Sequence, residues 1–389
     1  MDSRYPLASS TWDKSELKSI NKVIDSGIYS MGKFVAEFEN KFSDYNRSKY
    51  SVMVNSGSSA NLLAVAALFF IRNNPLKRGD EVIVPAVSWS TTYSPLQQYG
   101  LKLKFVDIDI NTLNYDLDKL SNAVSDTTRL ILAVNLLGNP NDFNQIQKII
   151  NKRDIIVLED NCESLGASYN SKKTGTIGLL GTFSSFFSHH ISTMEGGVIC
   201  TDNEELYQII KSLRAHGWTR NLDKNNLLCK KSDNDFEESF RFILPGYNVR
   251  PLEFSGAIGL EQLNKLPSFI DQRRKNHIVF NNLFKDDKRF ILQKEIGKSS
   301  WFGFSMVLSK TSGLKRQTVL DRLKKNNIDY RPIVSGNFCN SESLKYYDYE
   351  IHETVENAEY IDKNGFFVGN HHYDLKENIE FLKKILSEI

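Results

Sequence analysis

The segment Val54–Asn61 (VNSGSSAN) has the residue types of an anion-binding turn, because a glycine and several hydroxyl groups directly follow an apolar run. Glycine lets the backbone approach a ligand closely, and the free N–H groups at the start of a helix favour an anion. The functional interpretation is therefore a phosphate bound at this turn, although taken alone the segment is better explained as a structural turn. A tight strand-to-helix turn with serine caps explains the same residues without a ligand.

Two acidic residues, Glu159 and Asp160, end the apolar run at residues 155–158. Ligands of α/β proteins bind at the carboxyl ends of parallel strands, so a carboxylate here is suited to hold a protonated ring nitrogen or a metal ion. The alternative is an acidic cap on the next helix. Position alone does not decide between these two interpretations.

The segment Phe183–Gly197 (FSSFFSHHISTMEGG) contains two adjacent histidines, His189 and His190, ahead of two glycines. Neighbouring side chains in extended backbone point to opposite sides, so this pair is a poor bidentate metal site. A single histidine more often has a structural role, and this segment by itself is a weak indication of catalysis.

The elements that must position these segments alternate between strands and helices. We expect strands at residues 50–54, 81–84, 102–106, 130–135, 155–159, 182–187 and 197–201, with helical periodicity between most of them. This alternation predicts an α/β fold with a mostly parallel, seven-stranded central sheet. The continuous apolar run at residues 155–158 is typical of a sheet covered on both faces.

The sequence changes in character after about residue 266. A charged helix opening at Gln272, a strand and a leucine-rich helix predict a smaller α+β lobe there. We therefore expect an N-terminal arm at residues 1–30 with a helix at residues 13–26, a large ligand-binding α/β domain at residues 31–265, and a small C-terminal domain at residues 266–389.

Composition excludes several classes of protein. The chain of 389 residues has 49 Lys and Arg against 47 Asp and Glu, a net charge of +2, which is no footprint for nucleic acid. We see no apolar run long enough to span a bilayer and no apolar leader, so we expect a soluble, cytoplasmic protein without a membrane partner. The scattered cysteines Cys162, Cys200, Cys229 and Cys339 form no metal-binding pattern, which disfavours a bound metal or an iron–sulfur cluster.

Taken together and in this order, the three segments resemble the DegT-like sugar aminotransferases, which have the pyridoxal phosphate (PLP) fold of aspartate aminotransferase. Three more segments match that family: residues 84–89 (VPAVSW), 213–217 (LRAHG) and 246–250 (GYNVR). The resemblance covers nearly the whole chain and implies an aspartate-aminotransferase-type α/β fold that binds PLP.

The chain departs from that family at one position. The aminotransferases carry there the lysine that binds PLP covalently, whereas this chain has His189 and no lysine between Lys173 and Lys211. A Schiff base through this position is impossible, so PLP and its amine form, pyridoxamine phosphate (PMP), would be held non-covalently. A histidine here resembles the sugar 3-dehydratases. One of their branches acts on a CDP-sugar with an iron–sulfur cluster, and the other acts on GDP-4-keto-6-deoxymannose without one. The scattered cysteines favour the second branch.

The resemblance also implies roles for the residues near the cofactor. His189 would be the single catalytic base, with His190 structural. Asp160 would pair with the ring nitrogen, and Trp89 would stack on the ring, although a core tryptophan is the plainer interpretation. Glu163, where the aminotransferases usually have Gln or His, would serve the dehydratase chemistry, unless it is a solvated helix-cap acid.

The remaining implied roles concern anions and a partner subunit. Gly57, Ser58 and Ser184 would bind the cofactor phosphate within one subunit, and Asn248 would reach it from the neighbour, which predicts an obligate homodimer with shared sites. Arg220 and Arg250 are candidates to bind the nucleotide diphosphate or the glutamate carboxylates. Ordinary surface ion pairs are the alternative for both.

The implied reaction is removal of the C3 hydroxyl from GDP-4-keto-6-deoxymannose, in the synthesis of a lipopolysaccharide dideoxysugar such as colitose. Glutamate would regenerate PMP and leave as 2-oxoglutarate. Two alternatives stay open. A nucleotide-sugar 4-aminotransferase would need a lysine at position 189, and a non-catalytic protein of this fold should also have lost its other cofactor contacts.

Overall fold

A computed structural model describes residues 3–389 and places eight strands in one central sheet. Their order is β1-β9-β8-β5-β4-β2-β3-β12, and every neighbouring pair is parallel except the two that involve β9. The strands are β1 (Tyr50–Val54), β2 (Glu81–Pro85), β3 (Lys102–Val106), β4 (Thr128–Val134), β5 (Ile156–Asp160), β8 (Leu180–Ser184), β9 (Gly197–Thr201) and β12 (Tyr349–Ile351). The mostly parallel α/β sheet is confirmed, and all seven expected strands are present. The expected count was one short, because the three-residue β12 joins the edge beside β3.

Helices cover both faces of the sheet, as the apolar run in β5 predicts. On one face lie α3 (Gly57–Leu68), α4 (Ser90–Gln98) and α7 (Glu204–Arg214), and their apolar side chains share a core with Val82 and Val84. On the other face, α5 (Leu117–Ala123) and α6 (Phe143–Ile150) pack with Ile83. Successive residues of one strand thus enter opposite cores, which requires apolar residues throughout the strand.

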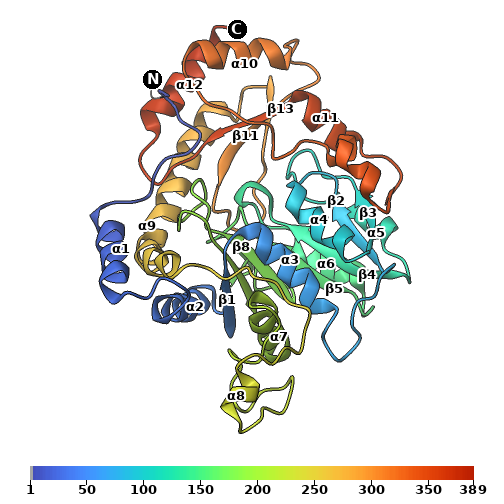
Figure 1. The fold of residues 1–389 in the computed structure, drawn as a ribbon. Helices are drawn as coiled ribbons and strands as arrows, with labels where there is room; N and C mark the ends of the chain where they lie inside the picture. The colour runs from blue at the N-terminus through green and yellow to red at the C-terminus, as the bar shows by residue number, and fades with distance from the viewer. Residues whose placement is uncertain (1–2) are drawn as a thin grey trace.

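A second, antiparallel sheet lies at the other end of the molecule (Figure 1). It consists of β10 (Phe290–Leu292), β11 (Gly303–Leu308) and β13 (Gly365–Gly369). The helices α10 (Arg316–Lys325), α11 (Glu356–Asn364) and α12 (Lys376–Ser387) accompany it. Smaller elements are β6 (Ser168–Tyr169), β7 (Lys172–Lys173), α8 (Asp235–Glu238) and the 3₁₀ turns η1 (Leu136–Gly138), η2 (Phe338–Asn340) and η3 (Glu342–Tyr346).

The long helix α9 (Glu253–Phe284) connects the two sheets, and Figure 1 shows it passing from the large sheet to the small one. The expected start of this helix at Gln272 is wrong, because the preceding residues Leu260, Leu263 and Leu266 form part of the same helix and pack in a core with α2 (Lys33–Asn46). Residues 265 and 266 therefore lie inside a continuous helix. The division into three domains at residues 30 and 265 stays a prediction.

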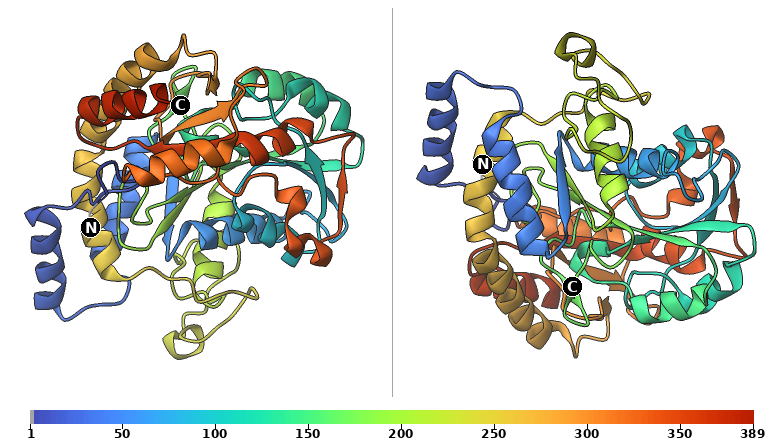
Figure 2. Two further views of the ribbon diagram at one scale, coloured as in Figure 1. Left: turned by 90° about the horizontal axis from the view of Figure 1, so that it is seen from above. Right: turned by 90° about the horizontal axis from the view of Figure 1, so that it is seen from below.

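The N-terminal helix α1 (Lys14–Ser26) lies outside α9 at the side of the molecule (Figure 2). Its predicted position is confirmed, with Asp13 as the N-cap and Glu16 completing a capping box. Within residues 3–389, no helix combines the length and the apolar character needed to cross a membrane.

Candidate active site

Asp160 lies at the carboxyl end of β5, near the middle of the sheet, and is only 5% exposed. Its Oδ2 accepts hydrogen bonds from Asn61 Nδ2 at 2.9 Å and from Thr92 Oγ1 at 2.8 Å. Its Oδ1 accepts one from the backbone N–H of Cys162 at 3.2 Å. No helix follows β5 directly, so Asp160 is not a helix cap, and the alternative interpretation is wrong.

Asn61 and Thr92 also belong to this candidate site, because both donate to Asp160, and the sequence alone assigned neither of them a role. Asn61 Oδ1 accepts from Thr182 Oγ1 at 2.6 Å, and Thr92 Oγ1 lies 2.9 Å from Ser88 Oγ, so both donors to Asp160 are themselves held. Asn61 stands four residues after Gly57, on the same face of the expected helix. That spacing was the available signal for Asn61, and no comparable signal marks Thr92.

The neighbouring Glu159 points to the opposite side of the sheet and has a structural role. Its buried carboxylate accepts the backbone N–H groups of Gly175 at 2.6 Å, Ile177 at 2.6 Å and Gly178 at 2.7 Å. Burial raises the pKa of Glu159 above its usual range, against the lowering effect of these N–H donors. The two adjacent acids therefore have different surroundings. Glu159 binds the backbone of residues 175–178, whereas Asp160 faces Asn61 and Thr92 in the candidate site.

The first turn of α3 lies against Ser184 at the end of β8. A side chain at Gly57 would place its Cβ 2.7 Å from Ser184 Cβ, so only glycine fits this contact. The cap of the helix is Ser56, whose hydroxyl accepts from Ser59 N at 3.1 Å. Because Ser56 is the cap, the Ser58 hydroxyl is not needed for capping, and its Oγ lies 2.8 Å from Thr91 Oγ1. The free N–H groups of the turn and the hydroxyls of Ser58 and Ser184 fit a phosphate group.

Trp89 stands at the start of α4 and is 58% exposed, so it is not a core tryptophan. Its near neighbour Thr91 contacts both Ser58 and Asn61, which places the indole at the rim of the same site. A cavity of about 420 Å³ opens beside it, lined also by Ser335, Asn337 and other residues. An exposed aromatic surface at the rim of such a cavity is suited to stack on a planar ring.

His189 lies in the loop between β8 and β9, and its ring has no hydrogen-bond partner at the buried Nδ1. The ring packs edge-on against Phe302, with centroids 5.2 Å apart. Burial and the nearby Arg273 guanidinium lower the pKa of His189 to about 4. The ring is therefore neutral near pH 7 and has a free nitrogen, as a proton acceptor requires.

His190 is held by protein contacts instead. It is buried, its Nε2 lies 3.2 Å from the carbonyl oxygen of Ser300, and its ring packs on the other part of Phe302 at 5.7 Å. Both rings thus contact Phe302, and Nδ1 is without a partner in each, but only the His190 ring has a nitrogen, Nε2, bonded to the protein within the described residues.

Glu163 is joined to the same region through the backbone. Its Oε2 accepts from Leu137 N at 2.9 Å, and Leu137 O accepts from Phe302 N at 3.0 Å. Burial and the nearby Asp160 raise the pKa of Glu163 to about 7, despite the opposing hydrogen bond from Leu137. No helix follows Glu163 directly, so it is not a helix-cap acid. Its carboxyl can gain or lose a proton near neutral pH.

The tight crossing of residues 136–139 with residues 300–302 supports both Glu163 and His189. A Cβ at Gly138, whose φ is 94°, would lie 2.5 Å from Trp301 N, so the crossing needs glycine at this point. Arg273 from α9 holds the far side, donating from Nη1 to Phe302 O at 3.1 Å and to Asn370 O at 2.6 Å. Arg273 is 3% exposed and forms no ion pair within residues 3–389. Phe302 and Arg273 lie far from His189 in sequence, and no pattern in the sequence marks them.

Asn248, Arg220 and Arg250 form a separate group around Trp218. The two guanidinium carbons lie 5.2 Å and 5.6 Å from the Trp218 ring centroid, and Arg250 Nε donates to Asn248 Oδ1 at 3.0 Å. Across the described part of the chain neither Arg220 nor Arg250 forms an ion pair with an acidic side chain. Two unpaired guanidinium groups beside one indole are suited to bind a phosphate or carboxylate.

The structure thus sorts the predicted residues into three sets. Linked contacts bring together Gly57, Ser58, Trp89, Asp160 and Ser184, and the crossing at Gly138 joins Glu163 to His189. No hydrogen bond in residues 3–389 joins Asn248, Arg220 or Arg250 to any of these residues. Over the same residues, no three His, Cys, Asp or Glu side chains are placed to hold a metal ion.

Comparison with known proteins gives strong similarities over the full length. A family model described as the DegT/DnrJ/EryC1/StrS aminotransferase family matches residues 10–378. The GDP-4-keto-6-deoxy-D-mannose 3-dehydratase of Escherichia coli O55:H7 is 61% identical over 384 residues, which is 98% of this chain and 99% of that protein. The protein of the same name from Yersinia pseudotuberculosis is 60% identical over 386 residues, 99% of this chain and 98% of that protein.

Two solved structures extend these similarities to three dimensions. The E. coli GDP-4-keto-6-deoxy-D-mannose 3-dehydratase with bound hydrated PLP has a TM-score of 0.98 and 60% identity, covering 99% of this chain and 100% of that one. A GDP-4-keto-6-deoxymannose 3-dehydratase with a trapped PLP–glutamate geminal diamine has a TM-score of 0.97 and 60% identity, covering 98% and 100%.

Proposed function

The chain belongs to the DegT/DnrJ/EryC1/StrS aminotransferase family, and on that basis we propose that it removes the C3 hydroxyl from GDP-4-keto-6-deoxy-D-mannose. It is a PLP-dependent sugar 3-dehydratase that uses glutamate as amino donor. The sugar ketone and glutamate yield GDP-4-keto-3,6-dideoxymannose, 2-oxoglutarate and ammonia. The observation that carries this proposal is His189, a neutral base with a free ring nitrogen at the position of the family's lysine, beside residues that fit PLP.

The residues fit a non-covalently bound PLP or PMP. The cradle of Gly57, Ser58 and Ser184 would hold its phosphate, Asp160 would keep a proton on its ring nitrogen, and Trp89 would cover its ring. When bound, the cofactor supplies the amine that meets the C4 ketone and a ring that accepts electrons. The family's lysine is absent, so no side chain at position 189 competes with that amine for the ketone.

His189 would transfer the protons in both halves of the reaction. With glutamate it removes the Cα proton, and with the sugar it removes a cofactor proton and assists departure of the C3 hydroxyl as water. A ring nitrogen without a partner is available to accept a proton, and the lowered pKa favours the release of that proton afterwards. A related 4-aminotransferase is disfavoured because it needs the lysine that His189 replaces. A non-catalytic protein is disfavoured because the contacts around Asp160 and Gly57 are intact.

The pH dependence of dehydration should have two limbs. The ring of His189 is a base above its lowered pKa of about 4, so activity should fall as the pH falls toward that value. We propose that Glu163 acts in its protonated form beside the cofactor. Its pKa is about 7, so activity should also fall as the pH rises through that value. The variant Glu163→Gln cannot ionise and should lose the alkaline limb in a plot of kcat against pH. An alkaline limb that stays in place in this variant would rule out the assignment to Glu163.

We propose that the active sites are shared across a homodimer, because no hydrogen bond within residues 3–389 joins Asn248, Arg220 or Arg250 to His189 or to the residues that would hold the cofactor. We expect His189→Asn and Asn248→Asp to be inactive alone but active after mixing and subunit exchange. Each mixed dimer would contain one site with both native residues, so about a quarter of wild-type activity should return at equal amounts. A mixture that stays inactive, with exchange shown by differently tagged subunits, would place each complete site in one chain.

A further inference from the structure

The N-terminal arm contacts the loop that carries the proposed base. Just before α1, Trp12 donates from its indole Nε1 to the carbonyl oxygen of Ser192 at 3.0 Å. Ser192 follows His189 by three residues and is 2% exposed. A segment near the start of the chain therefore holds the backbone of the loop between β8 and β9.

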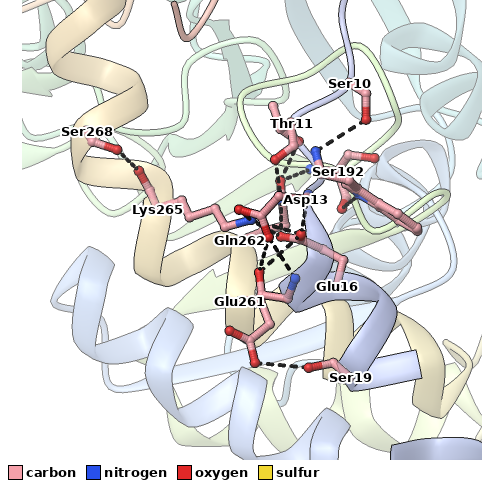
Figure 3. A network of polar contacts seen from close by, with 12 residues as sticks. Ser10, Thr11, Asp13, Glu16, Ser19, Ser192, Glu261, Gln262, Lys265 and Ser268 are labelled. Carbon is pink, nitrogen blue, oxygen red and sulfur yellow. Dashed lines mark hydrogen bonds and ion pairs between the residues drawn. The ribbon is translucent and has the colours of Figure 1, made fainter. Parts of the chain in front are cut away.

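Gln262 of α9 holds the same residue from the other side. Its Oε1 accepts from Ser192 N at 3.0 Å and from Thr11 Oγ1 at 2.6 Å. Its Nε2 donates to Glu16 Oε1 at 2.6 Å and to Thr11 O at 3.2 Å. The side chain is 0% exposed and all its hydrogen-bonding capacity is used (Figure 3).

The chemistry of the partners fixes the orientation of this amide. The backbone N–H of Ser192 can only donate, so it must face the amide oxygen, and the carboxylate of Glu16 can only accept, so it must face the amide nitrogen. A residue at position 262 therefore needs an acceptor on one side and a donor on the other. Glutamine satisfies this requirement, and a carboxylate or an apolar side chain does not.

Glu16 fixes the arm in this position. Its carboxylate is 0% exposed, accepts from Asp13 N at 2.7 Å in the capping box, and pairs with Lys265 Nζ at 2.7 Å and 2.8 Å. Lys265 therefore neutralises the buried charge that faces Gln262. The contact between the arm and the loop thus includes the buried ion pair of Glu16 with Lys265 (Figure 3).

The placement of His189 depends on the loop backbone, because the His189 ring has no side-chain hydrogen bond within residues 3–389. The base of the loop is closed where Thr193 N donates to Ser185 O at 2.9 Å and Ser185 N donates to Gly196 O at 2.9 Å. Beyond that closure, the backbone N–H and C=O groups of Ser192 are held by Gln262 and Trp12. We propose that Trp12 and Gln262 are positioning residues that hold Ser192 and thereby place His189 for proton transfer. This inference rests on the proposed role of His189.

The test compares Trp12→Phe and Gln262→Met with the wild-type protein. The first removes the indole N–H and keeps an aromatic ring, and the second keeps an unbranched chain without hydrogen-bonding groups. We expect kcat to fall about tenfold for Trp12→Phe and about a hundredfold for Gln262→Met, because small displacements of a catalytic group are costly. KM for the GDP-sugar and the affinity for PLP should stay within about twofold, since no hydrogen bond in the described part of the chain joins Trp12 or Gln262 to the residues that would hold the cofactor.

Ser19→Ala is the matched control. It removes the hydrogen bond from Ser19 Oγ to Glu261 Oε1 at 2.9 Å, which joins α1 to α9 without touching Ser192. Its kcat should equal that of the wild type. Wild-type kcat in a folded Trp12→Phe variant, or an equal loss in Ser19→Ala, would overturn the inference. If Gln262→Met does not fold, the kcat of Trp12→Phe alone tests the inference, because Trp12 is only half-buried and its replacement should leave the protein folded.

The glutamate half-reaction separates failure of this inference from failure of the proposed function. Conversion of PLP to PMP by glutamate also needs the base and is followed by absorbance without any sugar. A wild-type protein that converts PLP but does not dehydrate the GDP-sugar would refute the proposed substrate. Trp12→Phe and Gln262→Met should still convert PLP to PMP, but measurably more slowly than the wild type. Conversion at the wild-type rate in both variants would refute the positioning role.

Discussion

Replacement of His189 by asparagine is expected to lower the rate of dehydration at least about a thousandfold, near the upper range for loss of a general acid–base group. Asparagine keeps a polar side chain of similar reach but cannot accept and release a proton near neutral pH. The phosphate cradle, Asp160 and Trp89 are unchanged, so affinity for PLP and PMP should stay close to that of the wild type. Product formation by chromatography and cofactor affinity by absorbance titration check the two halves of this expectation.

A matched variant at the neighbouring histidine separates chemistry from structure. His190→Asn should lower stability, because His190 is buried and bonded to the Ser300 carbonyl, but it should leave a base at position 189. The loss of dehydration should therefore be much smaller in His190→Asn than in His189→Asn, per folded molecule. Full turnover by His189→Asn would remove the proposed role of this residue.

Replacement of Asp160 by asparagine is expected to slow both halves of the reaction about a hundredfold or more, because a fixed charge that acts on the reacting group is lost. Asparagine nearly matches aspartate in size and can still accept from Asn61 or Thr92, so the fold around β5 should persist. What disappears is the negative charge that would keep a proton on the cofactor ring nitrogen. The measurement is the rate of PLP conversion by glutamate, together with the rate of sugar dehydration.

Glu159→Gln provides the control for this prediction, since it alters the adjacent carboxylate on the opposite side of the sheet. Its carboxylate accepts three backbone N–H groups and faces no cofactor residue, so its loss should lower the free energy of unfolding by about 1–3 kcal/mol. The kcat of the folded fraction should be unchanged. Equal catalytic loss in Glu159→Gln and Asp160→Asn would show that the effect of Asp160 is structural.

The sequence predicts the parts of this molecule that depend on local patterns. Short β-rich runs mark the seven long strands, and their carboxyl ends hold the site residues because parallel strands share one direction. The asparagine-bonded Asp160 and the Gly57 turn lie where this rule places them. Trp89 shows the limit of the rule, because composition alone does not distinguish a rim tryptophan from a core tryptophan.

The features that the sequence does not predict depend on contacts between distant segments. The crossing joins Gly138 to Trp301, which lie more than a hundred positions apart in the sequence. Arg273 of α9 bonds to the carbonyl oxygen of Phe302, which lies beyond the end of that helix. No periodicity in the sequence indicates such contacts. The edge strand β12 is three residues long, too short for an alternating pattern. The start of α9 was misplaced because a charged cluster at Gln272 is more conspicuous than the apolar half of the helix that precedes it.

The central claim is tested most directly by mass spectrometry of the products formed from PLP, glutamate and GDP-4-keto-6-deoxymannose. A 3-dehydratase with His189 as its base predicts a GDP-sugar lighter by one oxygen atom, with release of 2-oxoglutarate and ammonia. A GDP-sugar that carries a new amine and keeps its C3 hydroxyl would contradict the claim and make the protein an aminotransferase without a lysine. An unchanged sugar in the presence of folded, PLP-bound protein would contradict the proposed substrate.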